Sequence, residues 1–137
     1  MTHKLTITQK PSYLHIVVTG QNSIETVVRY FDEIHRECAA RNCFRILIEE
    51  RLDGPRLGIL DIFRIVEEES SKSKGFFKAI AYVDVNAQGD LMKFAEDVAI
   101  NRSLPVTAFS TVAKAEKWLM NENPESTKPK TPVDADK

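Results

Sequence analysis

The chain has 137 residues, of which 42% are hydrophobic and 28% are charged, and its formal net charge is -1. A chain of this length is expected to form one domain and to bury about two thirds of the surface that its unfolded form exposes, so it can build a core without metals or crosslinks. The nearly neutral charge gives no electrostatic reason to bind nucleic acid, which requires a strongly basic face. We therefore expect a single globular domain and no nucleic-acid partner.

Signals for secretion or membrane insertion are not evident. The first ten residues, MTHKLTITQK, have no apolar stretch of the kind found in signal peptides, and no segment approaches the roughly 18 apolar residues of a membrane span. The only cysteines are Cys38 and Cys43, whereas small secreted domains usually carry more. We expect a cytoplasmic protein with two reduced thiols and no integral membrane association.

Two strands and a helix are predicted in the first third of the chain. Residues 4–9 and 13–19 are rich in β-branched side chains, and the short link around Pro11 favours an antiparallel pair. Ser23 is a natural N-cap for a helix whose apolar residues recur at helical spacing over residues 24–38. The chain therefore opens with an antiparallel hairpin followed by an amphipathic helix.

The rest of the chain alternates strands and helices. Further strands are predicted over residues 44–49, 77–84 and 104–109, and further helices within 57–69, over 90–102 and from 111 onward. The order ββαβαβαβα predicts an α/β fold: a mixed sheet of about five strands, with parallel crossovers after the hairpin, and about four helices. Few apolar residues follow position 120, so we expect residues 1–120 to form the domain and residues 121–137 to be a disordered polar tail.

The helix that follows the third predicted strand is unusually apolar. A helix that covers a sheet needs an apolar stripe about 100° wide. Four residues supply this stripe: Ile59, Ile62, Phe63 and Val66. Three more fall partly outside it: Leu57, Leu60 and Ile65. Either neighbouring helices cover these three, or they form an exposed patch that marks a partner or ligand surface. After them, residues 67–69 are expected to be a solvated helix end and residues 70–75 a polar break.

Two arginines flank the turn that precedes this helix. Arg51 and Arg56 lie on either side of Gly54, near a helix N-terminus, where free N–H groups and the helix dipole favour anions. A phosphate or carboxylate head group could bind there, with an apolar chain along the helix. In the simpler alternative, both arginines pair with nearby carboxylates, namely Glu49, Glu50, Asp53 or Asp61.

Motifs for catalysis or metal binding are weak. The same four carboxylates form an acidic neighbourhood, but acid–base work would require environments that separate their pKa values. His35 and Cys38 are three residues apart on a predicted helix, whereas a structural zinc site needs four ligands. The sequence contains neither a G-x-S-x-G elbow nor a glycine-rich phosphate loop. We expect no catalytic residue, no metal and no cofactor.

Several stretches together resemble the SpoIIAA-like (STAS-like) family of small bacterial proteins. They are VVTGQNSIETVVRYFDEI, FRILIEE with the following DG, AIAYVD and FAEDVAINRSLPVTAFSTVAKAEKWL. The likeness runs from about Tyr13 to Leu119, and its most specific part is VTAFSTVAKAEKWL, in which a strand ending at Phe109 leads into a helix containing Trp118. The resemblance implies a sheet of four to five strands with helices, and no known catalytic activity.

The resemblance also bears on regulation and ligands. Better-studied relatives of this fold, the anti-sigma-factor antagonists, are binding modules switched by phosphorylation of a serine in a D-S-S-G-like turn before the second helix. This chain has DGPRLG in that region and no hydroxyl residue between Arg51 and Val66, which argues against a switch of that kind. The family is similar in outline to lipid-carrying Sec14-type domains, which is compatible with an apolar ligand.

Two functional hypotheses follow. In the first, the chain is a non-catalytic interaction or regulatory module that contacts a protein partner, or a second copy of itself in a homodimer, through residues 50–66. The contact residues would be Arg51, Asp53, Gly54, Arg56, Leu57, Leu60 and Phe63. In the second, the chain carries or senses a small apolar or amphiphilic ligand between this helix and the sheet. The cavity would be lined by Leu57, Leu60 and Phe63, with Phe94 or Met92. An enzyme would require Glu49, Glu50 or Asp53 to converge in a cleft.

Overall fold

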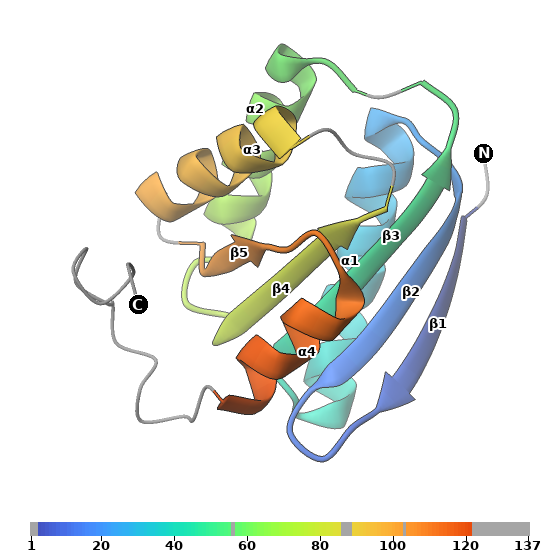
Figure 1. The fold of residues 1–137 in the computed structure, drawn as a ribbon, viewed down its shortest axis with the longest axis vertical. Helices are drawn as coiled ribbons and strands as arrows, with labels where there is room; N and C mark the ends of the chain where they lie inside the picture. Colours follow the sequence, from blue (N-terminus) through green and yellow to red (C-terminus); the bar gives the residue numbers. More distant parts are fainter. Residues whose placement is uncertain (1–2, 56, 86–88, 103, 122–137) are drawn as a thin grey trace.

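A computed structural model describes residues 3–55, 57–85, 89–102 and 104–121, and it describes only the backbone of residues 89–92, 94 and 95. Within these ranges, five strands and four helices alternate after an initial hairpin (Figure 1). The strands are β1 (His3–Gln9), β2 (Leu14–Gln21), β3 (Arg45–Asp53), β4 (Ala79–Asp84) and β5 (Val106–Ala108). The helices are α1 (Ile24–Arg41), α2 (Ile59–Lys72), α3 (Gly89–Asn101) and α4 (Val112–Asn121).

The strands form one mixed sheet in the order β1-β2-β3-β4-β5. β1 pairs with β2 in the antiparallel sense, and each later neighbour pair is parallel. The α/β fold predicted from the sequence, with an antiparallel hairpin followed by parallel crossovers, is therefore confirmed. Because β2 and β3 stay in register as far as Gln21 and Asp53, β3 continues four residues past its predicted end at Glu49.

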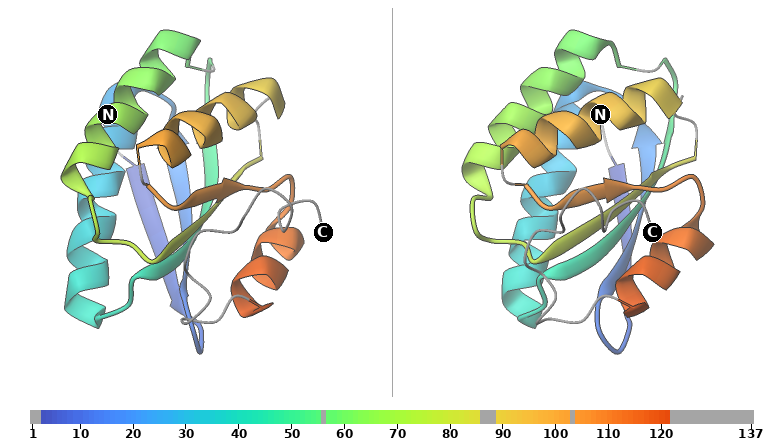
Figure 2. Two further views of the ribbon diagram at one scale, coloured as in Figure 1. Left: turned by 90° about the vertical axis from the view of Figure 1, so that its left-hand side faces the viewer. Right: turned by 60° about the vertical axis from the view of Figure 1, so that its left-hand side comes forward.

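Helices cover the two faces of the sheet unequally. α1, α2 and α3 contribute to a core on one face, here called the main core, whose sheet residues include Ile46, Ile48 and Ile80. α4 lies on the opposite face, where Ala115 and Leu119 pack against Leu47 and its neighbours. The views in Figure 2 show α4 alone on its side of the sheet. Since side chains alternate along a strand, even-numbered residues of β3 face the main core and odd-numbered residues face α4.

Helix α2 differs from its prediction in both orientation and length. Its buried residues are Ile65, Glu69 and Ser70, whereas Ile59, which was expected to face inward, is 54% exposed. The first turn of α2 extends past the end of the sheet, so it has no strand beneath it (Figure 1). The polar break predicted for residues 70–75 begins at Ser73, because α2 continues to Lys72. Within the helix, the Ser70 hydroxyl donates a 2.6 Å hydrogen bond to the carbonyl oxygen of Val66.

The predicted solvated helix end at residues 67–69 is also wrong for one of its three glutamates. Glu69 is only 2% exposed, whereas Glu67 and Glu68 are exposed. Glu69 lies four residues after Ile65 and three after Val66, which places it on the buried side of α2. A carboxyl group is therefore held inside the layer of helices.

Several sequence predictions concern the thiols, membrane insertion and the tail. Both cysteines are free thiols; Cys38 lies in the main core, where burial raises its pKa to about 12. None of the helices within the described ranges is long and apolar enough to cross a membrane. The tail predicted from residue 121 onward lies outside the described residues, except for Asn121, which ends α4.

Candidate interaction surface

The turn after β3 is held by the loop between β2 and α1. The backbone N–H of Asn22 donates to the carbonyl oxygen of Asp53 at 2.7 Å, and the Asn22 side-chain amide donates to the carbonyl oxygen of Pro55 at 2.9 Å. Between them, Gly54 has φ +100°, a backbone conformation that residues other than glycine rarely adopt. The start of the segment between β3 and α2 is therefore fixed by two hydrogen bonds and one glycine.

We expect Gly54→Ala to lower the free energy of unfolding by about 1 kcal/mol, because the added Cβ disfavours the positive φ. A steric clash is not the reason, since that Cβ would meet only the Gln21 side chain at ordinary contact distance, 3.7 Å. Gly58→Ala is the matched control: Gly58 has φ -80°, and a Cβ added there would meet no atom within 4 Å, so a change within about 0.5 kcal/mol is expected. Urea unfolding measures both, and equal losses would contradict the role assigned to Gly54.

The apolar residues after the turn divide into two sets. Leu60 is 79% exposed and Ile59 is 54% exposed, both in the first turn of α2. Leu57 is half-buried and packs against the main core. The ring centroid of the half-buried Phe63 lies 4.9 Å from the guanidinium carbon of Arg102, which directly follows α3. The structure thus exposes both Ile59 and Leu60, whereas Leu57 packs against the main core and Phe63 is covered in part by Arg102.

Only one of the two arginines that flank Gly54 in the sequence, Arg51, lies within the described residues. Arg51 lies on the α4 face of β3, where its Nε donates to the Glu49 carboxylate, so the simpler interpretation of this arginine is confirmed. Glu49 also forms a 2.8 Å hydrogen bond with His15. Although burial raises the pKa of Glu49, the bonds with His15 and Arg51 hold it below its usual value. Arg56 lies outside the described residues, and Arg51 is separated by the sheet from Leu57.

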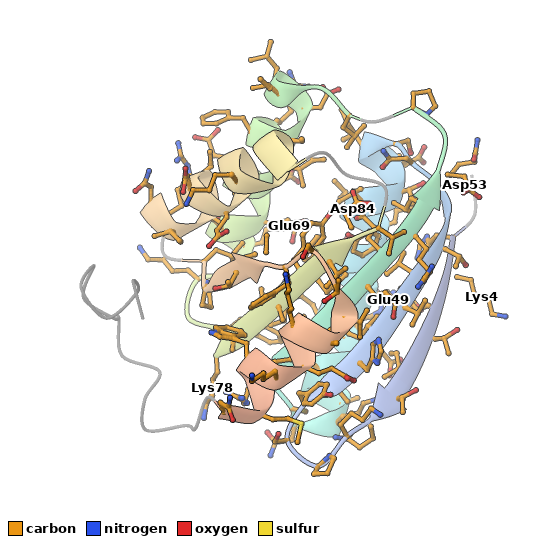
Figure 3. All side chains as sticks on the ribbon, viewed as in Figure 1. Lys4, Glu49, Asp53, Glu69, Lys78 and Asp84 are labelled. Atoms are coloured by element: carbon orange, nitrogen blue, oxygen red, sulfur yellow. The ribbon has the colours of Figure 1, made fainter. Side chains whose placement is uncertain are left out.

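The four carboxylates of the predicted acidic neighbourhood do not converge. Glu49 and Glu50 are consecutive on β3 and therefore face opposite sides of the sheet. Asp53 is exposed at the end of β3, and Asp61 is half-buried on α2. Figure 3 shows Glu49 and Asp53 at different points along β3. The cleft that an enzyme using Glu49, Glu50 and Asp53 would require is not formed by these residues.

Glu50 instead belongs to a group that we call the carboxyl cluster, which comprises the buried Glu50 and Tyr30 and the half-buried Tyr82 and Asp84. Glu50 is 3% exposed and accepts hydrogen bonds from the hydroxyls of Tyr30 and Tyr82, the second at 2.8 Å. It lies directly opposite Asp84 in the β3–β4 register. The pKa of Glu50 is raised to about 7: burial and the charge of Asp84 raise it, and the hydrogen bonds from the two tyrosines lower it.

The sequence contained signals for this cluster that were not used. Tyr30 is three residues after Val27 and four before Ile34, so it lies on the buried stripe of α1. Tyr82 and Asp84 are two residues apart on one strand and therefore share a face. Their meeting with Glu50 depends on the parallel register of β3 and β4, which a single sequence does not specify.

Comparison with protein-family models and with curated proteins identifies no relative of this chain. No protein-family model matches the chain, and no curated protein matches it. Among the described residues, no group of three histidine, cysteine, aspartate or glutamate side chains is arranged to hold a metal ion.

Proposed function

We propose that this chain is a non-catalytic interaction or regulatory module that contacts a protein partner, or a second copy of itself, through residues 50–66. The observation that carries the proposal is the exposure of two neighbouring apolar side chains, Leu60 at 79% and Ile59 at 54%. Complete burial of one leucine side chain is worth about 1.5–3 kcal/mol, so docking on these residues would be favourable. The turn after β3, which two hydrogen bonds from Asn22 hold in place, would position the start of the segment that carries them.

Two further features support a binding role over a chemical one. Glu50 carries the most strongly perturbed carboxyl group near this surface, but it is 3% exposed and engaged by two tyrosine hydroxyls, so it does not face a substrate. The resemblance to the SpoIIAA-like family, whose better-studied relatives of the same fold are binding modules, points the same way. Because the turn has no hydroxyl residue, the proposed module would not be switched by phosphorylation within residues 51–66.

The carrier hypothesis remains a prediction. It requires Leu57, Leu60 and Phe63 to line one cavity, with Phe94 or Met92, whose side chains lie outside the described part of the chain. Leu57 packs against the main core, while Leu60 is mostly exposed to solvent. This arrangement favours a docked partner over an enclosed ligand as the group that covers Leu60.

Leu60→Asp tests the proposed surface, with Met120→Asp as the matched control. Met120 is 71% exposed and lies on α4, on the other face of the sheet. Both substitutions therefore replace an exposed apolar side chain with a carboxylate. If the module binds a second copy, sedimentation equilibrium should show a dimer that Leu60→Asp weakens by about ten-fold or more and Met120→Asp leaves intact.

If the wild-type protein is a monomer, the proposed partner is a different protein, and a second experiment is needed to detect it. A photo-crosslinking residue at position 60 should then capture a protein from cells of the source organism, and one at position 120 should not capture it. Circular dichroism confirms that each variant is folded. The proposal fails if positions 60 and 120 behave alike in both experiments.

A further inference from the structure

Strand β1 has one edge without a neighbouring strand. The sheet order places β1 at one end of the sheet, beside β2, and no described strand pairs with its other edge (Figure 1). β1 has seven residues, whereas β5, at the opposite end of the sheet, has three. An unpaired strand of this length presents a row of main-chain donors and acceptors that can pair with a strand of another chain.

The turn after β1 indicates which main-chain groups face this free edge. The N–H of Lys10 donates to the carbonyl oxygen of Tyr13 at 2.9 Å, and these two residues continue the register that pairs Gln9 with Leu14. Because hydrogen-bonded pairs recur at every second residue of an antiparallel ladder, the even-numbered residues of β1 bond to β2. The odd-numbered residues, from His3 to Gln9, therefore direct their N–H and C=O groups to the free edge.

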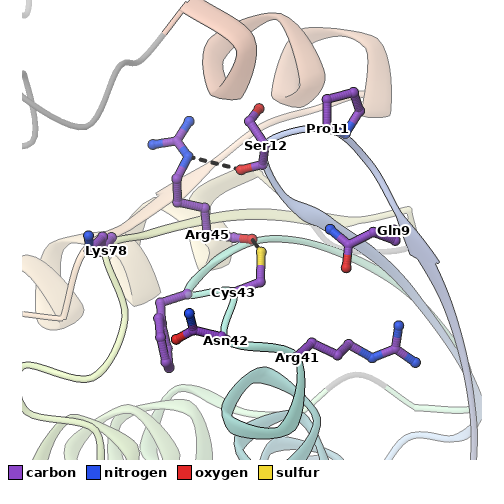
Figure 4. A pocket seen from close by; sticks show the side chains of 9 residues that line it. Gln9, Pro11, Ser12, Arg41, Asn42, Cys43, Arg45 and Lys78 are labelled. Atoms are coloured by element: carbon purple, nitrogen blue, oxygen red, sulfur yellow. Dashed lines mark hydrogen bonds between the residues drawn. The ribbon is translucent and has the colours of Figure 1, made fainter.

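β1 has few of the features that protect edge strands from pairing. Natural edge strands are often protected by a proline, a bulge or several charges. Pro11 lies in the turn that follows β1 and not within the strand (Figure 4). The register with β2 is continuous from His3 to Gln9, and Lys4 is the only lysine, arginine, aspartate or glutamate in the strand. The free edge of β1 is therefore open to pairing.

We propose that two copies of this chain associate by antiparallel pairing of their β1 strands. The twofold axis passes beside Thr6, the middle residue of the strand. This axis places residue 5 opposite residue 7 of the second copy, and residue 3 opposite residue 9, so the outward-facing groups of one copy meet those of the other. About eight main-chain hydrogen bonds would join the two sheets into one.

The side chains that this pairing brings together are compatible on both faces of the sheet. On the face of the main core, Leu5 would lie opposite Ile7 of the second copy. Both are half-buried and pack against the main core, so part of each side chain is left to be covered. On the α4 face, where the side chains of Lys4, Thr6 and Thr8 are exposed, Thr6 would lie opposite Thr6 and Lys4 opposite Thr8. Pairs of apolar residues and pairs of threonines stabilise adjacent strands.

Charge and strand length favour this register over the neighbouring ones. A shift by two residues in one direction would place Lys4 opposite Lys10 of the second copy, and His3 opposite Pro11, which has no N–H to donate. A shift by two residues in the other direction would leave Thr8 beyond the end of the partner strand. The register about Thr6 uses all seven residues of β1 and places no like charges opposite each other. The edge of β1 is thus complementary to a second copy of itself.

Amide hydrogen exchange of the full chain, followed by NMR at low and at high protein concentration, tests the pairing. The amides of Leu5 and Ile7 should exchange more slowly at high concentration, because they are hydrogen-bonded only in the dimer. The amides of Thr6 and Thr8 bond to β2 in both states and should change much less. Equal slowing of all four amides would contradict the proposal, since it would indicate association elsewhere on the chain.

Thr6→Glu is the test substitution, and Thr19→Glu is the matched control. Both threonines are exposed on the α4 face, but Thr19 lies on β2, one strand away from the edge. Two glutamates at position 6 would face each other across the twofold axis. Sedimentation equilibrium at low ionic strength should therefore show a dimer that Thr6→Glu weakens by about ten-fold or more and Thr19→Glu by less than about two-fold. An equal mixture of Thr6→Glu and Thr6→Lys should restore the dimer, because opposite charges then meet.

The same measurement separates this proposal from the proposed interaction surface. The two are distinct, because β2 lies between β1 and β3. A dimer weakened by Thr6→Glu and not by Leu60→Asp supports the pairing of β1 and leaves a different protein as the partner of residues 50–66. A dimer weakened by Leu60→Asp and not by Thr6→Glu would overturn the pairing while supporting the surface at residues 50–66. A wild-type protein that stays monomeric at about 1 mM would also overturn the pairing.

Discussion

The free energy of unfolding is expected to fall as the pH rises from about 4.5 to about 7, because two buried glutamates keep their protons in the folded protein. Burial raises the pKa of both Glu50 and Glu69 from 4.5 to about 7. A group whose pKa is higher in the folded state contributes its full stability below its unfolded pKa and loses it as the pH approaches the folded value. Acid should therefore stabilise this protein in a range where many proteins begin to lose stability.

Different neighbouring charges act on the pKa values of the two glutamates. The charge of Asp84 adds to the effect of burial on Glu50, so this residue should account for a loss of about 3 kcal/mol between pH 4.5 and pH 7. Neither carboxyl oxygen of Glu69 has a hydrogen-bond partner among the described residues, but the partly exposed Lys72 ammonium lies 3.5 Å away and lowers its pKa. Glu69 should account for a similar loss, about 3 kcal/mol, because its pKa of about 7 already includes the effect of Lys72.

Urea unfolding at pH 5 and pH 8 measures this effect, and Glu69→Gln isolates one contribution to it. The variant should be less sensitive to pH than the wild-type protein, because a glutamine at position 69 carries no proton to lose. The exposed Glu67, two residues earlier on α2, provides the control substitution Glu67→Gln, which should leave the pH dependence unchanged.

The contribution of His35 to stability changes with pH in the opposite direction. Burial lowers its pKa, so its contribution to stability increases as the pH rises through its unfolded value of 6.5. The comparison of the Glu69→Gln and wild-type proteins removes this background, since His35 is present in both. A wild-type protein that is more stable at pH 8 than at pH 5, with Glu69→Gln showing the same difference, would contradict the assigned role of the glutamates.

The sequence was sufficient to predict the fold because its strongest signals are local and periodic. The helical spacing of apolar residues over 24–38 and the runs of β-branched residues predicted α1 and the order of strands and helices along the chain. The end of β3 was missed because Glu49 and Glu50 interrupt the apolar pattern, and charged residues usually indicate a loop. With the strand extended to Asp53, alternation places Glu50 on the same face as Ile48.

The candidate surface was predictable only in part. The excess of apolar residues over 57–66 indicated an unusual helix, and Leu60 does fall outside the buried stripe. Ile59 was assigned to the wrong side because helical spacing does not reveal that the first turn of α2 extends past the sheet. Glu69 was assigned to solvent because three consecutive glutamates look like a solvated face, although only one of them lies on the stripe.

Tyr30→Phe should destabilise the protein more at pH 8 than at pH 5. Tyr30 is fully buried, and its hydroxyl donates to the Oε2 of Glu50. At pH 8 Glu50 is mostly ionised, and loss of a hydrogen bond to a buried charge should cost about 2 kcal/mol, compared with about 1 kcal/mol for the neutral carboxyl at pH 5. Urea unfolding of the variant and the wild-type protein at both pH values measures the difference.

Tyr82→Phe is the matched control within the carboxyl cluster. Its hydroxyl donates to the other oxygen of Glu50 at 2.8 Å, but Tyr82 is only half-buried, so water can replace part of the lost bond. We expect a smaller loss at pH 8, about 1 kcal/mol. Both substitutions should also raise the pKa of Glu50, because the tyrosine hydrogen bonds lower it. Titration of the Glu50 carboxyl carbon by NMR reads this change directly, and a pKa that stays constant in Tyr30→Phe would show that Tyr30 only fills space.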